Sequence, residues 1–260
     1  IQIKKIITIH DTIHEKFSLV YKDNFFNKRK KILETMDKII CVSENTKKDL
    51  LNFYNLRPDK IEVIYNGSDH LIPVKNRENL EISVEKPYIL YVGSRSKYKN
   101  FNLFIEAFSK SKKIYDNFDV ICFGGGNFSK LEIDLLKKLK VLNKINLILG
   151  DDRKLKSCYK NASLFIYPSL YEGFGIPILE AMHEGCPTIV SDIPVFREIL
   201  DNRSYFFDPK NCENLIFNME KILFDSEIKN NLISLGRTDS KKYTWSECYN
   251  KTMKLYNLFK

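Results

Sequence analysis

The sequence contains no apolar run long enough to cross a membrane, because none approaches the ~20 residues that a spanning helix needs. Its first five residues, Ile-Gln-Ile-Lys-Lys, lack the apolar core and the small-residue cleavage site of a secretory signal. Internal repeats and low-complexity tracts are also missing. These absences argue against integral membrane, secreted and repeat proteins, and they predict a cytoplasmic globular chain.

Patterns that bind metal ions are equally scarce. The six cysteines form no C-x-x-C pair, and most stand beside apolar residues, which indicates buried free thiols in a reducing compartment. No Asp-x-Asp motif is present. His10 and His14 have a spacing that suits a metal pair on a helix, but His10 ends a predicted strand. We therefore expect no metal ion and no cofactor.

Acidic residues are outnumbered, with 33 Asp and Glu against 42 Lys and Arg, for a net charge of +9. Such a surface can meet nucleic acid, an anionic membrane or a phosphorylated substrate. The densest cluster, Lys28-Arg29-Lys30-Lys31, follows Phe25-Phe26, a combination typical of helices that lie on membranes. A solvated helix face in a lysine-rich chain is the alternative that we favour. We expect no nucleic-acid partner, and a peripheral contact with the inner face of the cytoplasmic membrane through Lys28–Lys31 stays open.

Short apolar runs alternate with helical patterns along the chain, which is typical of parallel β-α-β units and of the α/β fold class. Strands are predicted at 5–9, 38–43, 62–65, 88–92, 119–123, 145–149, 162–167 and 187–190. Helices are predicted at about 24–36, 43–54, 100–110, 130–140, 155–159, 176–184, 196–200, 213–223, 226–236 and 245–259.

Residues 71–86 have no clear period and separate two groups of strands. The first group has three strands, fewer than the ~5–6 of a complete doubly wound sheet. We therefore predict an incomplete Rossmann-like domain over 1–75 and a complete one over 76–242. A last helix within 243–260 is predicted to pack back toward the first domain.

The most informative motif directly follows the predicted strand at 162–167. Gly173 and Gly175 let a ligand approach the backbone closely, and the helix that begins at Ile176 offers its positive end to a pyrophosphate. Glu172 lies on the loop and Glu180 about one turn into the helix, so both carboxylates can accept hydrogen bonds from vicinal hydroxyls. This arrangement is typical of a nucleotide-sugar site; a glycine-rich turn before an ordinary amphipathic helix is the alternative.

Two cations follow the predicted strand at 88–92. Gly93 and Ser94 precede Arg95, and Lys99 lies four residues further on. Because parallel strands end at one edge of a sheet, both cations are expected near Glu172. Departure of a nucleoside diphosphate builds negative charge, which fixed cations stabilise. We predict that Arg95 and Lys99 bind the donor and act in catalysis; two ordinary surface cations are the alternative.

Residues 169–198 resemble the signature of retaining family 4 glycosyltransferases, which have the two-domain GT-B fold. The residues that carry the resemblance are Ser169-Leu170-Tyr171-Glu172-Gly173-Phe174-Gly175-Ile176-Pro177-Ile178-Leu179-Glu180-Ala181-Met182, Ser191-Asp192-Ile193-Pro194 and Glu198. Further similar motifs are Val42-Ser43, Asn66-Gly67-Ser68-Asp69, Tyr91-Val92-Gly93-Ser94-Arg95 with Lys99-Asn100, and Tyr243-Thr244-Trp245. The third of these looks like the family's phosphate-binding loop, which implies that Gly93 and Ser94 also bind the donor. The similarity extends over nearly the whole chain. It implies that 1–75 is the rear part of the acceptor-side domain and that 76–242 is the nucleotide-sugar donor-binding domain.

The resemblance implies roles for individual residues. Glu172 would hold the hydroxyls of the donor sugar and Glu180 the ribose. The backbone amides of Gly173, Phe174 and Gly175 would meet the sugar and the phosphates, with Ile176 beside them. His10, at a strand end that faces the cleft in such enzymes, would contact the donor sugar, whereas His14 is expected to be structural. The catalytic set is thus expected to comprise Glu172, His10, Arg95 and Lys99.

The resemblance also implies a reaction: transfer of a sugar from a nucleoside diphosphate to a glycan or lipid-linked acceptor, with retention and without a metal ion. The loop from Gly93 to Asn100 looks like that of mannosyl- and perosaminyl-type transferases, which favours a GDP-linked donor and surface polysaccharide synthesis. A non-catalytic partner subunit and a nucleotide-sugar epimerase of GT-B fold are the alternatives. Because such enzymes usually begin well upstream, we expect a fragment, a shortened protein or one completed by a second chain.

Overall fold

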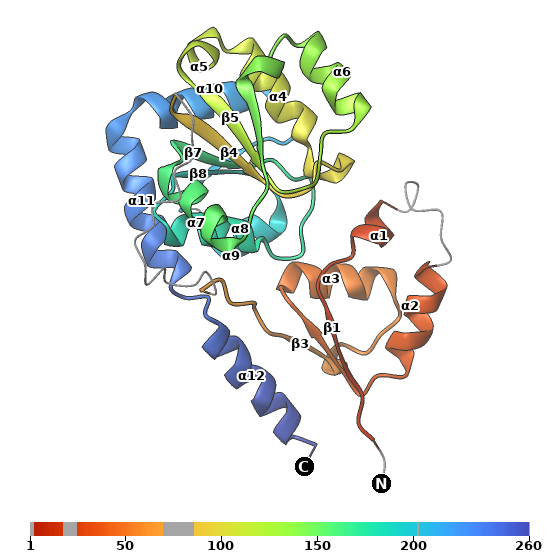
Figure 1. Cartoon of the computed structure of the whole chain (residues 1–260). Helices are drawn as coiled ribbons and strands as arrows, with labels where there is room; N and C mark the ends of the chain where they lie inside the picture. Colours follow the sequence, from red (N-terminus) through yellow and green to blue (C-terminus); the bar gives the residue numbers. More distant parts are fainter. Residues whose placement is uncertain (1–2, 18–24, 70–85, 202, 260) are drawn as a thin grey trace.

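The computed structural model of the chain contains two bodies, each built around a parallel sheet (Figure 1). The structure describes residues 3–17, 25–69, 86–201 and 203–259. All pairings between described strands are parallel, within one sheet of three strands and one of six. The predicted α/β class with two Rossmann-like sheets is confirmed. The boundary predicted between residues 75 and 76 lies outside the described residues.

The smaller body holds three strands in sequential order, β1 (Ile6–Ile9), β2 (Lys38–Cys41) and β3 (Ile61–Val63). Its helices are α1 (Ile13–Lys16), α2 (Phe25–Glu34) and α3 (Glu44–Phe53), with a 3-10 turn at Pro58–Lys60. One sheet face is buried under α2 and α3, where Leu33 and Leu50 pack against Ile39. Ser43 caps α3, since its hydroxyl accepts a hydrogen bond from the Thr46 amide.

The last helix, α12 (Trp245–Asn257), leaves the larger body and runs beside the smaller one (Figure 1). Its Leu255 is buried against Ile40 and Ile64, on the sheet face opposite to α2 and α3. A hydrogen bond also joins the start of α12 to the segment that follows β3. The Trp245 amide donates to the Asp69 carboxylate at 2.8 Å. The chain end therefore helps to hold the two bodies together.

The larger sheet has the strand order β6-β5-β4-β7-β8-β9. Its strands are β4 (Tyr88–Val92), β5 (Asp119–Phe123), β6 (Ile145–Ile148), β7 (Leu164–Tyr167), β8 (Thr188–Ser191) and β9 (Tyr205–Phe207). From β4 the chain first builds the sheet in one direction and then returns to add β7 on the other side. The β4–β7 boundary is therefore the topological switch point, outside whose carboxyl ends open α/β sheets bind ligands.

Helices cover both faces of this sheet, and the strand residues alternate between them. Leu90 faces the layer of α7 (Asp152–Asn161), α8 (Ile176–His183) and α9 (Pro194–Leu200). Ile89 and Tyr91 face the opposite layer, whose helices are α4 (Phe101–Lys110), α5 (Lys112–Asn117), α6 (Lys130–Lys138), α10 (Cys212–Phe224) and α11 (Ser226–Ser240). Each large apolar side chain buried there contributes about 1.5–3 kcal/mol.

Among the described residues, no helix is both long enough and apolar enough to span a bilayer. Most predicted elements agree with the structure within a few residues. The predicted helix at 155–159 is longer, because Asp151 caps it and adds a first turn. Three short elements, α1, α5 and β9, were not predicted, since three to six residues carry too little periodicity.

Candidate active site

The loops that follow β4 and β7 meet at the switch point of the larger sheet. Lys99 ends a 3-10 turn in the first loop, and Glu172 lies in the second. The Lys99 ammonium donates to Glu172 Oε1 at 2.6 Å and to the Tyr167 hydroxyl at 3.1 Å. The two charged side chains are only 14% and 10% exposed. The structure thus brings together these two sequence-predicted residues as a largely buried ion pair, and it adds Tyr167.

Tyr167 ends β7 and packs its ring under the ammonium, which lies 5.1 Å from the ring centroid. Burial and the neighbouring Glu172 carboxylate raise the pKa of Tyr167 well above its ordinary value. The phenol is therefore neutral near pH 7, and its oxygen is an additional acceptor for Lys99. The flexible stem and three donors of a lysine ammonium allow it to turn from these two acceptors toward a further anion.

The glycine loop after Glu172 lies against the smaller body. The Gly173 carbonyl accepts hydrogen bonds from Ser43 at 2.7 Å and from Thr46 at 3.2 Å. A Cβ at Gly173 would overlap the backbone carbonyl of His10. Gly175, with φ +105°, is the N-cap of α8. Both glycines are thus required by local geometry, whatever ligand binds beside them.

Phe174 and Ile176 contribute little side chain to this loop surface. The Phe174 side chain is 4% exposed and contacts the Tyr65 and Tyr243 rings at 5.9 and 5.6 Å between centroids. Ile176 begins α8 and packs against the core. At both residues, the backbone is the part that the expected donor contact would use.

Glu180 lies in the second turn of α8 and is 5% exposed. The hydroxyl of Tyr159, on α7, donates to Glu180 Oε2 at 2.9 Å. Burial and the Glu180 carboxylate raise the pKa of Tyr159 well above its ordinary value, so the phenol keeps its proton. The sequence did not single out Tyr159, because a lone tyrosine in an amphipathic helix is ordinarily interpreted as a residue that packs in the core.

Tyr171 is a second functional neighbour that the sequence reasoning missed. Its hydroxyl lies 2.7 Å from the Thr12 hydroxyl and donates to Asp49 Oδ2 at 3.0 Å. Asp49 Oδ1 in turn pairs with Lys16 at 3.0 Å. The residue before Glu172 is therefore tied to the smaller body, as Gly173 is after it.

A cavity of about 440 Å³ opens beside this contact. Helices α1 and α3 of the smaller body form one side, and α9 with the β7 loop forms the other. The lining residues include Lys16, Phe17, Asn45, Leu170 and Tyr171. The cavity thus offers both hydrogen-bonding groups and apolar surface next to the Glu172 loop.

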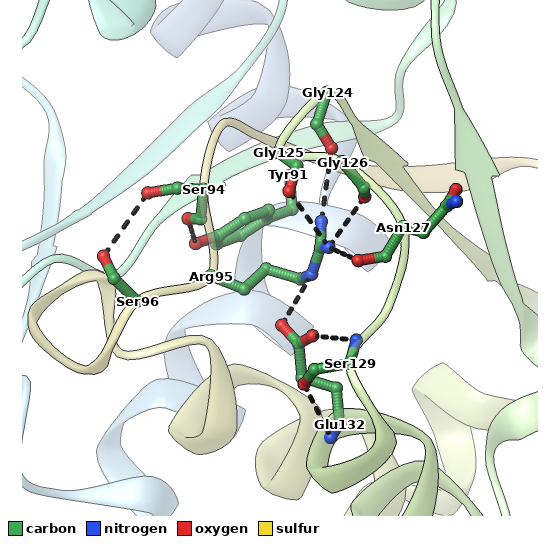
Figure 2. Close-up of polar contacts among 10 residues, drawn as sticks. All are labelled: Tyr91, Ser94, Arg95, Ser96, Gly124, Gly125, Gly126, Asn127, Ser129 and Glu132. Atoms are coloured by element: carbon green, nitrogen blue, oxygen red, sulfur yellow. Dashed lines mark hydrogen bonds and ion pairs between the residues drawn. The ribbon is translucent and has the colours of Figure 1, made fainter.

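Arg95 follows the same strand as Lys99, and its side chain points toward the glycine loop after β5 and toward Glu132 of α6 (Figure 2). Nε donates to Glu132 at 2.7 Å, and the terminal nitrogens donate to the carbonyls of Gly124–Asn127 at 2.8–3.3 Å. The guanidinium also lies 4.5 Å from the centre of the Phe128 ring. The sequence predicts that Arg95 binds the donor and acts in catalysis. In the structure most donors of its guanidinium are engaged, because Glu132 and four carbonyls surround it.

The remaining candidates lie around this centre. Gly93, with φ +108°, has open space where a Cβ would be, and the Ser94 carbonyl accepts from the Tyr91 hydroxyl at 2.7 Å. The His10 side chain is exposed, while its backbone faces Gly173. The His14 ring stacks on Phe25 at 4.4 Å between centroids, which is a packing role. In the parts of the chain that the structure describes, no three His, Cys, Asp or Glu side chains are grouped to hold a metal ion.

Comparison with known proteins gives two family matches. Residues 74–239 match the family described as glycosyl transferases group 1, and residues 1–70 match glycosyltransferase family 4. O-antigen chain mannosyltransferase RfbU of Salmonella typhimurium is 33% identical over 230 residues, which cover 81% of this chain and 60% of that protein. O-antigen chain mannosyltransferase B of Escherichia coli is 26% identical over 253 residues, covering 91% and 65%. The chain thus spans 60–65% of the length of these relatives.

Solved structures show the same fold. Sucrose-phosphate synthase from Thermosynechococcus elongatus superposes with a TM-score of 0.84 at 21% identity, covering 100% of this chain and 68% of that one. The lipopolysaccharide glycosyltransferase WaaG gives 0.79 at 18% identity, covering 96% and 74%. These neighbours confirm the predicted GT-B architecture. Because the first family match extends over more than half of the sequence, this chain belongs to the glycosyl transferases of group 1.

Proposed function

We propose that the protein transfers a sugar from a nucleoside diphosphate to a glycan or lipid-linked acceptor, with retention and without a metal ion. The observation that carries the proposal is the Lys99–Glu172 pair, 2.6 Å apart at the switch point of the larger sheet. A cation for a leaving diphosphate and a carboxylate for sugar hydroxyls lie there side by side. Lys99 can therefore bind the phosphate side of a sugar–phosphate bond, and Glu172 can bind the sugar side.

Donor binding would exchange the partners of this pair. The diphosphate attracts the Lys99 ammonium, supported by the amino end of α8, and Glu172 is released to accept hydrogen bonds from sugar hydroxyls. The bond from the sugar anomeric carbon to the diphosphate oxygen then breaks as the acceptor oxygen bonds to the same face of that carbon. The acceptor proton passes to the departing phosphate. Lys99 stabilises the charge that develops on the diphosphate.

Glu180 suits the nucleoside end of the donor. Tyr159 occupies one of its oxygens at 2.9 Å and so holds the carboxylate in a fixed orientation. A fixed carboxylate can accept from the two vicinal hydroxyls of a ribose with little loss of side-chain entropy. This role is independent of the base, so Glu180 does not distinguish GDP from UDP.

The donor and acceptor classes draw support from the relatives. Two of them are described as O-antigen chain mannosyltransferases, which favours a GDP-linked mannosyl donor and surface polysaccharide synthesis for this chain. The cavity between the bodies, beside Tyr171, is a suitable place for the acceptor. Its polar groups match sugar hydroxyls, and Phe17 and Leu170 match apolar sugar faces.

Peripheral membrane contact through α2 is part of the proposal. Lys28, Lys30 and Lys31 are exposed there, and Phe26 is 42% exposed. Arg29 does not belong to this surface, because it pairs with the buried Glu15 at 2.8 Å. Flotation with anionic vesicles tests the contact. Replacing the three lysines with alanine should abolish flotation, and unchanged binding would contradict a role for α2.

A nucleotide screen tests the proposed reaction. We expect one of GDP, UDP and ADP to raise the melting temperature, because a ligand that binds only the folded state stabilises it. Release of that nucleotide from its sugar donor should require an acceptor and should persist in EDTA. Glu172→Ala should abolish transfer while the chain stays folded. Loss of activity in EDTA would contradict a metal-independent reaction, and acceptor-independent conversion of the donor would favour an epimerase.

A further inference from the structure

Arg95 ties three elements together (Figure 2). Its side chain is 2% exposed and reaches from the β4 loop to the glycine loop after β5 and to the first turn of α6. Glu132 accepts from Arg95 through Oε1 and from the Ser129 amide, at 2.6 Å, through Oε2. Although burial opposes it, the hydrogen bonds from Ser129 and the Arg95 guanidinium hold the pKa of Glu132 below its ordinary value. Both side chains are thus charged and mutually satisfied.

The glycine loop is the element that this pair restrains. Gly124, Gly125 and Gly126 have φ values of +74°, +72° and +73°, a left-handed conformation that glycine adopts most readily. Three consecutive glycines have high conformational entropy when they are free. Here the carbonyls of Gly124–Asn127 converge on the Arg95 guanidinium (Figure 2). The guanidinium therefore bonds to four successive carbonyls of the loop in this conformation.

The two sides of the loop differ. A Cβ at Gly125 would overlap the Gly93 carbonyl, so that residue packs tightly against the β4 loop. At Gly93, Gly124 and Gly126 an added Cβ would meet nothing within 4 Å. Backbone without side chains therefore borders open space at the carboxyl ends of β4 and β5, along the same sheet edge as Lys99. A ligand can approach main-chain groups there closely.

We propose that Arg95 is a positioning residue: with Glu132 it forms a latch that holds the glycine loop in its binding conformation, and it does not itself contact the diphosphate. The proposal rests on the proposed function, which places the donor at this sheet edge. Glu132 and four carbonyl dipoles already balance the guanidinium charge. Without the latch, the donor would have to order the glycines when it binds, which weakens affinity.

A double-mutant cycle separates the latch from direct contact. The probe is the nucleoside diphosphate that the melting screen selects from GDP, UDP and ADP, and the dissociation constant is measured by calorimetry. We expect Arg95→Ala and Glu132→Ala each to weaken binding about tenfold, as losing a charge-assisted hydrogen bond does. The double variant should bind no more weakly than either single one, because both substitutions break the same latch.

If Arg95 instead contacted the diphosphate directly, Glu132→Ala would strengthen nucleotide binding or leave it unchanged. Removing that carboxylate would free the guanidinium for the diphosphate, so wild-type or tighter binding by Glu132→Ala would overturn the latch. If either alanine variant fails to fold, Glu132→Gln keeps the volume and the Ser129 contact. Weaker binding by Glu132→Gln supports the latch, and unchanged binding overturns it. Hydrogen exchange of the amides at 124–127 should accelerate in every latch variant without nucleotide and slow again when nucleotide is bound.

Lys144→Ala is the matched control for a merely structural effect. Lys144 pairs with Asp119 at 3.2 Å, at the amino end of β5, and the two side chains are 12% and 18% exposed. Its loss should lower the melting temperature and leave the dissociation constant unchanged.

The Lys99→Ala variant tests the proposed donor site itself. If no nucleotide affects the wild type, or if Lys99→Ala binds normally, the proposed function fails and the latch with it. If Lys99→Ala weakens nucleotide binding as expected, but the losses of binding free energy in Arg95→Ala and Glu132→Ala add up in the double variant, the latch is refuted and the proposed function stands.

Discussion

Replacing Lys99 with methionine should lower the stability of the fold and weaken donor binding, for two different reasons. Methionine keeps much of the aliphatic stem but removes the ammonium 2.6 Å from Glu172, whose side chain is only 10% exposed. Breaking one side of a buried pair costs about 3 kcal/mol. For a chain of this size, that loss lowers the melting temperature by roughly 6–12 °C. The same substitution removes the cation for the diphosphate.

Adding Glu172→Gln to Lys99→Met distinguishes the two effects. The neutral pair no longer buries an uncompensated charge, so about 2 kcal/mol of stability should return. Nucleoside diphosphate affinity should stay at least tenfold below that of the wild type, because no cation has been restored. Melting curves and calorimetry on the wild type, the two single variants Lys99→Met and Glu172→Gln, and the double variant measure both quantities. The reasoning would be refuted if the losses of unfolding free energy in the two single variants added up in the double variant, or if Lys99→Met bound the nucleoside diphosphate as tightly as the wild type.

Three further outcomes follow from the contacts between elements. Glu198→Ala should lower the free energy of unfolding by about 2 kcal/mol, since its carboxylate accepts from two backbone amides at the start of α3 at 2.7 and 2.9 Å; unchanged denaturant curves would contradict this. Burial holds the pKa of His183 below 6.5, so the unfolded chain takes up a proton first and stability should fall as the pH drops through 6.5. Melting temperatures at several pH values should show that slope in the wild type and lose it in His183→Gln. Gly173→Ala should force the loop away from the His10 carbonyl and weaken donor binding; a Kd equal to that of the wild type would argue against the contact.

Local sequence signals predicted the elements that carry the site. The apolar runs at 88–92 and 119–123 match β4 and β5 to the residue, because both strands are buried on both faces and bounded by glycine or aspartate. Gly175 before Pro177 marked the start of α8. Because parallel strands end at one edge of a sheet, the sequence also predicted that Lys99 lies near Glu172.

Long-range side-chain contacts did not follow from the sequence. The position of Arg95 after β4 is a local property, but its partner Glu132 lies 37 residues further on. A guanidinium on a flexible stem reaches either the crevice or the glycine loop, and only the packed structure selects one. The same holds for Tyr171, whose phenol meets Asp49 at a separation of 122 residues. Sequence periodicity contains no information on such pairs.

The segment around Glu172 has a consequence for protein engineering. Tyr171 and the Gly173 carbonyl are bonded to the smaller body, while Glu172 itself pairs with Lys99 of the larger one. Chimaeras that exchange one body between relatives would therefore mismatch this loop, even when they are joined at a harmless position between the bodies. Exchange of the smaller body should succeed only when Ser43, Asp49 and their loop partners are transferred as a set.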